Sequence, residues 1–586
     1  MQDPAERSAN AKEAAVDTKR MRTHREPLPE GRGSERRSSV RVTRAILRGV
    51  GERLLLVLMA LAMPIAALAH DEYSVAADVA IGHVDFQVAC ARGVRADFDR
   101  ALGLMHHMMY EEARSGFEAV AAADPTCAMA YWGIATTLFQ PLWPSRPGPE
   151  ALQRGAALSE QARAFATSDR ETALIEATSA FFAEPDSAEY WQRIERWAQG
   201  MEAAYAAFPD DLDTAALYGL SRVALAPIAE DRGALFDEAE AVLSEVFERE
   251  PLHPGGIHYA IHATDVDGRA ANALEQVAVY GDIAPQVPHA LHMPTHIYVR
   301  LGEWPGVIEW NRRSADAALE FPVGDRISLH YIHALDYMLY AALQQGDDSY
   351  AQAVLDEALS AEPYEEHFGG AFHLAIMPAR YAVERRAWSE AAELPLLQPA
   401  YVDWSRYAWP QAISWFGRGL GALHVGRTAE AREAEARLIE LRDQASAAGE
   451  RAMAAYIEID RRILSGKLAW VDGDAEGAIT LIEEAAALER TVEKHPVTPG
   501  ALLPPYEALG DLLLELGRPA EALAAYEASD AMWPGRLNTL LGAGRAALAI
   551  EEEQAAREHF ARLLAIAGES ERATLAEARV FMAGGD

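Results

Sequence analysis

The feature that most constrains this chain is a repeated pair of helical segments. Residues 506–534, "YEALGDLLLELGRPAEALAAYEASDAMWP", hold two amphipathic stretches joined at Gly517 and closed by Pro534. Small residues stand where two helices would approach closely, and a proline cannot continue a helix. A similar unit begins near Leu537, and others run through residues 110–135 and 416–431. Such a repeat predicts a stack in which each helix pair covers the next.

These units resemble the 34-residue tetratricopeptide repeat (TPR) at Tyr506, Leu509, Gly510, Ala522 and Tyr526. The resemblance implies an all-α fold, a TPR-like α-solenoid of antiparallel helical hairpins spanning residues 95–586. Such solenoids bury a continuous core between repeats and present a concave surface to ligands. Residues 70–94 differ, because "IGHVDFQVA" alternates apolar and polar residues. That alternation predicts a short extended segment that caps the N-terminal end.

Four further motifs narrow the resemblance. They are "HPGGIHYAIH" (253–262), "HALHMPTHI" (289–297), "HALDY" (333–337) and "EKHPVTPG" (493–500). With these motifs the chain resembles a family of secreted bacterial TPR proteins. The resemblance implies export and the fold, and it implies no particular activity.

Residues 1–69 have the pattern of a basic lead followed by a secretory signal peptide. The apolar run "LLLVLMALAMPIAALA" (54–69) ends in Ala67 and Ala69, two small residues at the spacing that signal cleavage requires. We therefore expect an exported, periplasmic or secreted protein that begins at His70. An uncleaved membrane anchor is the alternative. No later segment is apolar enough to span a membrane.

Charge and cysteine content limit the partners and the environment. The net charge of −36 argues against nucleic acid as a partner, because an acidic surface repels phosphate. Cys90 and Cys127 are the only cysteines. In an exported chain they are expected to form a disulfide between the N-terminal segment and the first helices, and two buried thiols are the alternative.

Histidines gather in one part of the repeat array, where residues 253–333 hold eight of the chain's 18. When Gly268, Gly302 and Gly346 are aligned as equivalent turn positions, the histidines fall on one stripe of three neighbouring helices, at spacings of three and four. The groove region therefore spans residues 253–340. The metal-ligand candidates on the stripe are His258, His262, His289, His292, His296, His333 and Asp336. Asp265, His330 and Tyr340 are expected to line the ligand groove beside them.

The stripe has a structural and a functional interpretation. Most single helical histidines are ordinary core or surface residues, and repeat duplication could copy one of them. Duplication does not explain histidines at three different stripe positions, and a polar cluster of this size is costly to bury dry. Imidazole ligands favour zinc or copper over calcium or magnesium. A second group in "LMHHMMY" (104–110) also suggests copper, although methionines on a helix usually fill core.

Three functions remain open from the sequence. The first is an exported solenoid whose groove binds a transition metal, a peptide or small polar ligand, or both. The second is a metal-dependent hydrolase or oxidoreductase that uses the same histidines. The third is a protein-interaction scaffold without a metal.

Overall fold

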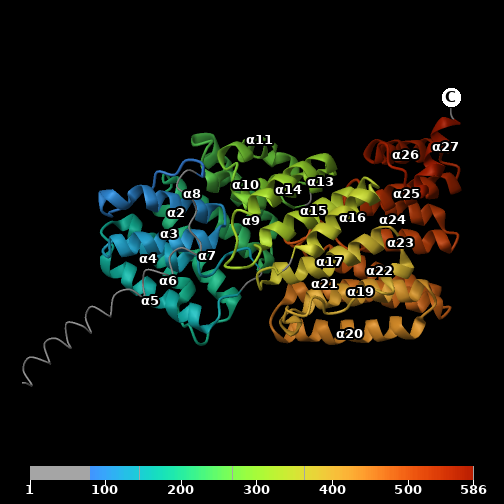
Figure 1. Ribbon diagram of the computed structural model, residues 1–586, viewed down its shortest axis with the longest axis horizontal. Coiled ribbons are helices and arrows are strands. Elements are labelled where there is room, and N and C mark those ends of the chain that lie inside the picture. Colours follow the sequence, from blue (N-terminus) through green and yellow to red (C-terminus); the bar gives the residue numbers. More distant parts are fainter. Residues whose placement is uncertain (1–78, 144–145, 267, 362, 585–586) are drawn as a thin grey trace, which may run out of the picture. The chain divides into compact units, whose positions relative to one another are not determined.

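The computed structural model describes residues 79–143, 146–266, 268–361 and 363–584, which all belong to one compact unit. The described part contains helices and no β-strand, so the all-α prediction is confirmed. Helices adjacent in sequence pack against each other, as in α8 with α9 and α14 with α15, which gives the TPR-like stack shown in Figure 1. The predicted signal peptide and the expected first residue, His70, lie outside the described residues.

The helices before the histidine region are α2 (Arg95–His106), α3 (Tyr110–Ala123), α4 (Ala128–Thr136), α5 (Pro149–Phe165), α6 (Asp169–Phe182), α7 (Tyr190–Ala207), α8 (Leu212–Leu225) and α9 (Arg232–Arg249). Those of the histidine region and just after it are α10 (Pro254–Thr264), α11 (Leu274–Ile283), α12 (Pro288–His292), α13 (Pro294–Leu301), α14 (Trp304–Ala318), α15 (Leu329–Gln344), α16 (Asp348–Ser360), α17 (Phe368–Glu384) and α18 (Trp388–Ala391).

The remaining helices are α19 (Ala408–His424), α20 (Thr428–Ala447), α21 (Arg451–Val471), α22 (Ala475–Glu489), α23 (Pro505–Glu515), α24 (Pro519–Met532), α25 (Leu537–Ala549), α26 (Glu553–Ala567) and α27 (Ala576–Ala583). Short 3-10 helices occur at η1 (Arg92–Val94), η2 (Ala226–Ile228), η3 (Ala270–Ala273), η4 (Trp404–Arg406) and η5 (Ala573–Leu575).

Glycines set the geometry of the helix pairs in two ways. Gly302 ends α13 in the left-handed region at φ 68°, a conformation that costs glycine little, and the chain then turns into α14. Gly268 and Gly346 also have positive φ, at 79° and 70°, so the three glycines aligned from the sequence share one conformation. Gly510 acts by its size, because a Cβ there would lie 2.7 Å from the ring of Tyr526 on the partner helix.

The N-terminal segment 79–91 forms neither helix nor strand. His83 N donates to the Leu252 carbonyl at 2.8 Å, and Ala91 N donates to Asp124 Oδ2 at 2.7 Å. Cys90 and Cys127, 37 residues apart, are joined by a disulfide. These contacts attach the segment to the early helices and to the turn before α10.

Two large apolar cores meet at the histidine region. One core contains buried residues from Val79 to Ile297, and the other contains residues from Ala315 to Ala546. The histidines come from α10, α12 and α13, which contribute apolar residues to the first core, and from α15 and α17, which contribute apolar residues to the second. The polar cluster therefore lies where the two cores join.

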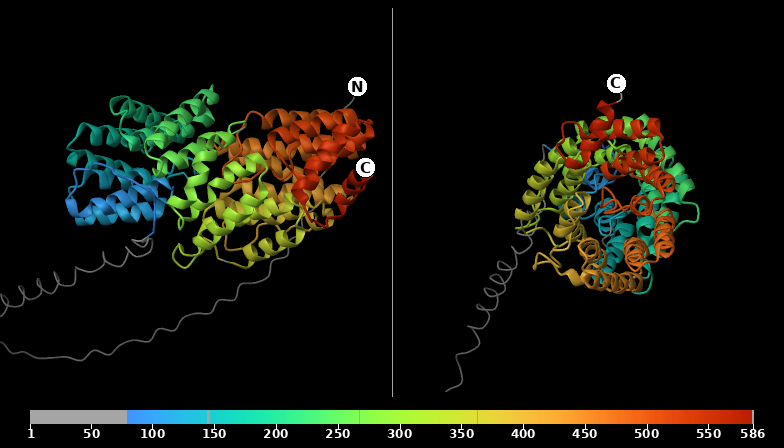
Figure 2. Two further views of the ribbon diagram at one scale, coloured as in Figure 1. Left: turned by 90° about the horizontal axis from the view of Figure 1, so that it is seen from above. Right: turned by 90° about the vertical axis from the view of Figure 1, so that its right-hand side faces the viewer.

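The last repeats also contact the middle of the chain. α25 packs against α15, and Figure 2 shows the C-terminal helices in red beside the yellow-green segment that includes α15. Arg536 connects them, since its guanidinium lies 2.8 Å from Glu384 Oε1 and 2.9 Å from Glu507 Oε2 and donates to the Tyr340 hydroxyl at 3.1 Å. All four side chains are buried.

Candidate metal centre

Eight histidine rings form one continuous array. Each ring has at least one neighbour whose centroid lies between 4.1 and 5.8 Å away. All but the half-buried His330 are at most 7% exposed. The histidine array consists of His258 and His262 on α10, His289 and His292 on α12, His296 on α13, His330 and His333 on α15, and His373 on α17.

Two triads within the array have the spacing of a metal site. The first triad is His258, His262 and His289, and the second triad is His292, His296 and His333. In each triad three ring nitrogens, one per residue, lie within 4.8 Å of one another. The sequence placed these six residues on one stripe, and the structure brings all six together in an enclosed position.

In the second triad, His296 is held by a carboxylate. Its Nδ1 lies 2.8 Å from Asp265 Oδ2. Burial opposes ionisation of Asp265, but Lys494 and Arg300 outweigh it and hold the pKa of that carboxyl well below its ordinary value. An ionised carboxylate only accepts hydrogen bonds, so His296 donates from Nδ1 and its Nε2 carries the lone pair.

His292 is oriented by an amide in the same way. Its Nδ1 lies 2.7 Å from Asn311 Oδ1 on α14. Asn311 Nδ2 donates to the Val307 carbonyl at 2.9 Å, and that bond fixes which end of the amide faces the histidine. His292 therefore donates from Nδ1, and its Nε2 also carries a lone pair.

His333 is oriented through a second histidine. His373 Nδ1 lies 3.1 Å from Asp336 Oδ2, and Arg380 Nε donates to Asp336 Oδ1 at 3.2 Å. His373 donates to the carboxylate, so its Nε2 is an acceptor. That nitrogen lies 2.8 Å from His333 Nδ1, which must donate. The relay from Asp336 to His333 leaves His333 Nε2 with a lone pair.

The Nε2 atoms of His292 and His296 lie only 3.0 Å apart. With both protons on Nδ1, two lone pairs face each other, and no hydrogen bond forms between them. Burial lowers the pKa of His292 well below 6.5, and it lowers the pKa of His296 despite the nearby Asp265. A bridging proton is therefore disfavoured, and the arrangement suits a metal cation.

In the first triad, several ring nitrogens lack a hydrogen-bond partner. His258 Nδ1 donates to the His106 carbonyl at 2.6 Å, which leaves Nε2 with the lone pair. That Nε2, His262 Nε2 and both ring nitrogens of His289 are buried without a hydrogen-bond partner among the described residues. Each buried polar atom without a partner destabilises the folded protein by about 1–3 kcal/mol. The first triad contains several such atoms.

A loop from far along the chain closes over the array. The crossing loop (residues 493–500) joins α22 to α23 and contains the "EKHPVTPG" motif. Lys494 Nζ lies 3.0 Å from Asp265 Oδ2, and the Pro496 carbonyl accepts from Tyr337 at 2.9 Å. Arg380 donates to the Gly500 carbonyl at 3.2 Å. The motif therefore supports the residues that orient the second triad.

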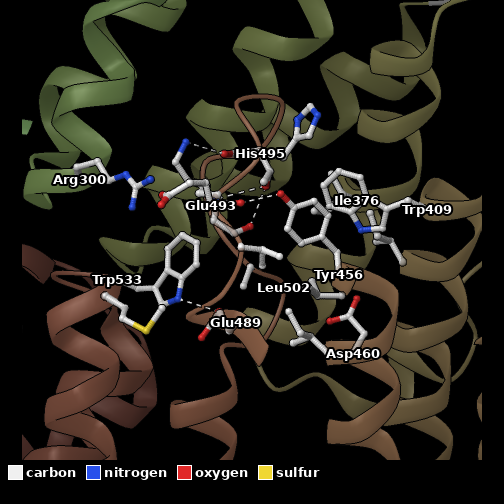
Figure 3. A pocket seen from close by; sticks show the side chains of 18 residues that line it. Arg300, Ile376, Trp409, Tyr456, Asp460, Glu489, Glu493, His495, Leu502 and Trp533 are labelled. Atoms are coloured by element: carbon white, nitrogen blue, oxygen red, sulfur yellow. Dashed lines mark hydrogen bonds between the residues drawn. The ribbon is translucent and has the colours of Figure 1, made fainter. Parts of the chain in front are cut away.

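Cavities lie on either side of the crossing loop. A cavity of ≈ 40 Å³ is lined by His262, His289, His296 and His333, with Trp143 and the loop's His495 at its wall. Figure 3 shows another cavity, of ≈ 90 Å³, with Arg300, Glu493 and Tyr456 at its edge and Trp533 donating to Glu489 at 3.2 Å. Arg300 connects this second cavity to Asp265.

A larger cavity of ≈ 420 Å³ reaches the array at His262 and Asp265. Its wall is aromatic and charged, with Trp143, Tyr190 and Arg146 among the lining residues. Arg146 stacks on Tyr190 at 3.8 Å and pairs with Glu450 at 3.4 Å. Since this cavity and the ≈ 40 Å³ cavity share Trp143, His262 and His495, they are neighbours at the histidines.

The "LMHHMMY" residues do not join the array. His106 Nε2 lies 2.9 Å from Asp213 Oδ1, and His253 Nε2 lies 3.2 Å from the same oxygen. Although these three residues have metal-site spacing, their facing atoms already have partners. His107 bonds to Tyr280 and to the Ile81 carbonyl, both at 3.0 Å. The methionines here are buried in the apolar core, where Met108 also lines the ≈ 40 Å³ cavity, and Cys127 is in the disulfide.

Two sequence-based assignments need correction. Asp336 was expected among the ligands, but His373 and Arg380 occupy its oxygens, so it orients His333 from behind. Tyr340 was expected in the groove, but its hydroxyl accepts from Arg536, and its ring packs on Trp304. One turn earlier on α15, Tyr337 packs against His292 and His333 instead. Asp265 lines the larger cavity and orients His296, and His330 packs on His289 and Trp143.

Residues outside the predicted ligand and groove sets complete the centre: Trp143, Arg300, Asn311, Tyr337, His373, Arg380 and Lys494. His373 follows His333 by 40 residues. A longer loop before its helix makes this spacing differ from the 34-residue spacing between the earlier histidines. Tyr337 and Lys494 could have been found from the sequence, because each lies in one of the four motifs.

No protein-family model and no curated protein matches this sequence. Among solved structures, the chain is similar to the human IFIT1 dimer with PPP-AAAA, with 13% identity, a TM-score of 0.34, and coverage of 80% of this chain and 89% of that one. The APC/C hetero-tetramer Cut9-Hcn1 matches with 12% identity, a TM-score of 0.28, and coverage of 84% and 89%. Yeast Tom70 matches with 10% identity, a TM-score of 0.28, and coverage of 84% and 96%.

Proposed function

We propose that this protein is an exported TPR-like solenoid that binds a transition metal ion through His292, His296 and His333. The observation that carries the proposal is the 3.0 Å approach of two Nε2 atoms whose protons are both directed away, onto Asn311 and Asp265. A cation between the rings removes the repulsion of the facing lone pairs.

The geometry and the ligand type agree on the class of ion. Two imidazole nitrogens on one tetrahedral zinc ion lie about 3.3 Å apart when each Zn–N bond is about 2.0–2.1 Å. A small adjustment of the two rings would reach that separation. Neutral imidazoles suit zinc or copper, and they suit calcium and magnesium poorly because those ions require oxygen ligands.

The decisive measurement is the metal content of protein isolated from its native compartment without chelators. We expect zinc or copper at one equivalent or more per chain. Replacing His296 by Phe should remove the ion of the second triad while keeping the ring's packing on Tyr337, and Asp265 retains Arg300 and Lys494 as partners. The matched control is His424→Phe, because His424 stacks on Trp388 far along the sequence from the array. Equal metal content in wild type and His296→Phe would refute the proposal.

A ligand-binding or catalytic role beside the ion is the second candidate. It is supported by the ≈ 420 Å³ cavity, which reaches the array at His262 and has room for a peptide side chain or a small polar molecule. A bound ion with an open position facing that space could activate water for hydrolysis. Turnover of model esters, peptides and phosphates that disappears with a chelator and returns with zinc or copper would establish an enzyme. Metal binding without turnover would leave a binding protein.

Export and membership of the secreted bacterial TPR family also remain proposals. They are supported by the apolar run at residues 54–69 and by the four motifs. Among the described helices, none has both the length and the apolar character needed to cross a membrane. TPR-like repeats also suit a protein partner on the outer surface, which would be compatible with a metal ion inside.

A further inference from the structure

The first triad carries evidence of a second ion that is independent of the lone-pair contact in the second triad. Four of its ring nitrogens are buried and unpartnered in the described structure: Nε2 of His258, Nε2 of His262, and both nitrogens of His289. His258 is already oriented, because its Nδ1 donates a hydrogen bond to the His106 carbonyl. Buried polar groups in proteins are nearly always paired, so several orphaned nitrogens at one point indicate a ligand.

The two triads are adjacent. The rings of His262 and His296 are 5.8 Å apart, and those of His289 and His292 are 6.1 Å apart. His289 and His292 lie on the same short helix, α12, one turn apart, so one helix contributes a ligand to each triad. The fold therefore places two sets of three imidazoles side by side.

Both triads face one small cavity. The ≈ 40 Å³ space is lined by His262 and His289 of the first triad and by His296 and His333 of the second. A cavity needs about 10–15 Å³ of this kind of space to hold a water molecule, so a water or a small anion fits here. A ligand in that position would contact ions in both triads.

We propose that the centre holds two transition metal ions, one in each triad, with a water-derived or other small anionic ligand between them. The proposal rests on the proposed function for the second triad and adds a second ion beside it. Paired ions in proteins typically lie about 3.5–4 Å apart and share such a ligand. Six neutral imidazoles supply no negative charge, and Asp265 is already paired with Arg300 and Lys494, so a bridging hydroxide or similar anion is expected to offset the charge of the ions.

The test measures metal stoichiometry in the full-length protein loaded with Zn²⁺ or Cu²⁺ and freed of excess ion by gel filtration. We expect two equivalents in wild type, one in His289→Phe, one in His296→Phe, and none in the double variant. His289→Phe is the sharpest change, because neither nitrogen of His289 makes a hydrogen bond within the described structure that the substitution could break. His424→Phe should retain two equivalents. Circular dichroism verifies folding, and His262→Phe replaces His289→Phe if that variant unfolds.

Electron paramagnetic resonance of the copper-loaded protein tests whether the ions are close. Two bridged Cu²⁺ ions couple magnetically, so wild type should show clearly less signal than two isolated ions would give. His289→Phe should show the full signal of one ion. One equivalent in wild type that only His296→Phe removes would overturn the two-ion proposal and leave the proposed function intact. No bound metal in wild type would overturn both, and two equivalents with a full two-ion signal would overturn the bridged arrangement.

Discussion

At the scale of single residues, the centre depends on which nitrogen of each histidine carries the proton. Four of the six triad histidines have a fixed Nδ1 partner, and those partners are of four kinds: a backbone carbonyl, an amide, a carboxylate and a second histidine. Each partner accepts a hydrogen bond from Nδ1 and leaves the Nε2 lone pair free to bind metal. The partner residues should therefore matter for affinity although none of them binds the ion.

Asn311 offers the cleanest test of this dependence. Asn311→Leu keeps the approximate volume but removes the acceptor for His292 Nδ1, so we expect metal affinity to fall about 10–100-fold. Competition with a chromogenic chelator measures the change. Ser314→Ala is the matched control on the same helix, because Ser314 donates to the Pro288 carbonyl at 2.8 Å and touches no triad nitrogen. Equal losses in both variants would show that Asn311 acts only through general packing.

His107 should make the metal-free protein sensitive to acid. Burial lowers its pKa to about 3, so between that value and the ordinary 6.5 the unfolded chain binds a proton that the folded chain does not. The unfolding free energy therefore reaches its full value, as far as His107 affects it, above pH 6.5. As pH falls below that value, it decreases by up to about 1.4 kcal/mol per pH unit. Denaturant unfolding of chelated wild type and His107→Gln from pH 7 to 5 should show a shallower pH dependence in the variant. Parallel profiles would contradict this assignment.

At the scale of elements, the disulfide fixes the irregular segment 79–91 to the start of α4. Closing a loop of 37 residues should stabilise the fold by about 3–4 kcal/mol in the chain-entropy model. We expect Cys90→Ala/Cys127→Ala to unfold at correspondingly lower denaturant concentration. Unreduced, denatured wild type should show no thiol by colorimetric titration, and two reactive thiols would exclude the bond.

The sequence predicts the elements well and the centre in part. Helix pairs and their glycine turns repeat locally, so Gly268, Gly302 and Gly346 suffice to place six histidines on one stripe. Burial of that stripe could not be predicted, because it depends on the crossing loop, which lies about 200 residues further along the chain than α13. Tyr340 was misplaced for the same reason, since its partner Arg536 comes from another repeat. His373 could not be assigned to the stripe from the sequence, because the loop before α17 disrupts the period.

At the scale of the whole molecule, Arg536 connects distant repeats. It is buried with Glu384 and Glu507, so removing its charge would leave two buried carboxylates without their main partner. We expect Arg536→Met to cost about 3–5 kcal/mol of unfolding free energy. The surface pairs of Arg518 with Glu476 and Glu521 provide the control, and Arg518→Met should lower the unfolding free energy far less than Arg536→Met does. Similar small losses in both variants would show that α15 and α25 are energetically independent.

The crossing loop also has a consequence for the order in which the centre is completed. All six triad histidines lie between residues 258 and 333, but His373 and Lys494 follow them, and the His106 carbonyl precedes them. A chain synthesised only as far as α15 would hold all six rings. It would lack His373, which orients His333, and Lys494, which pairs with Asp265. We therefore expect full metal affinity only in a chain that includes the crossing loop, and a truncated product that ends before residue 493 should bind the ion more weakly.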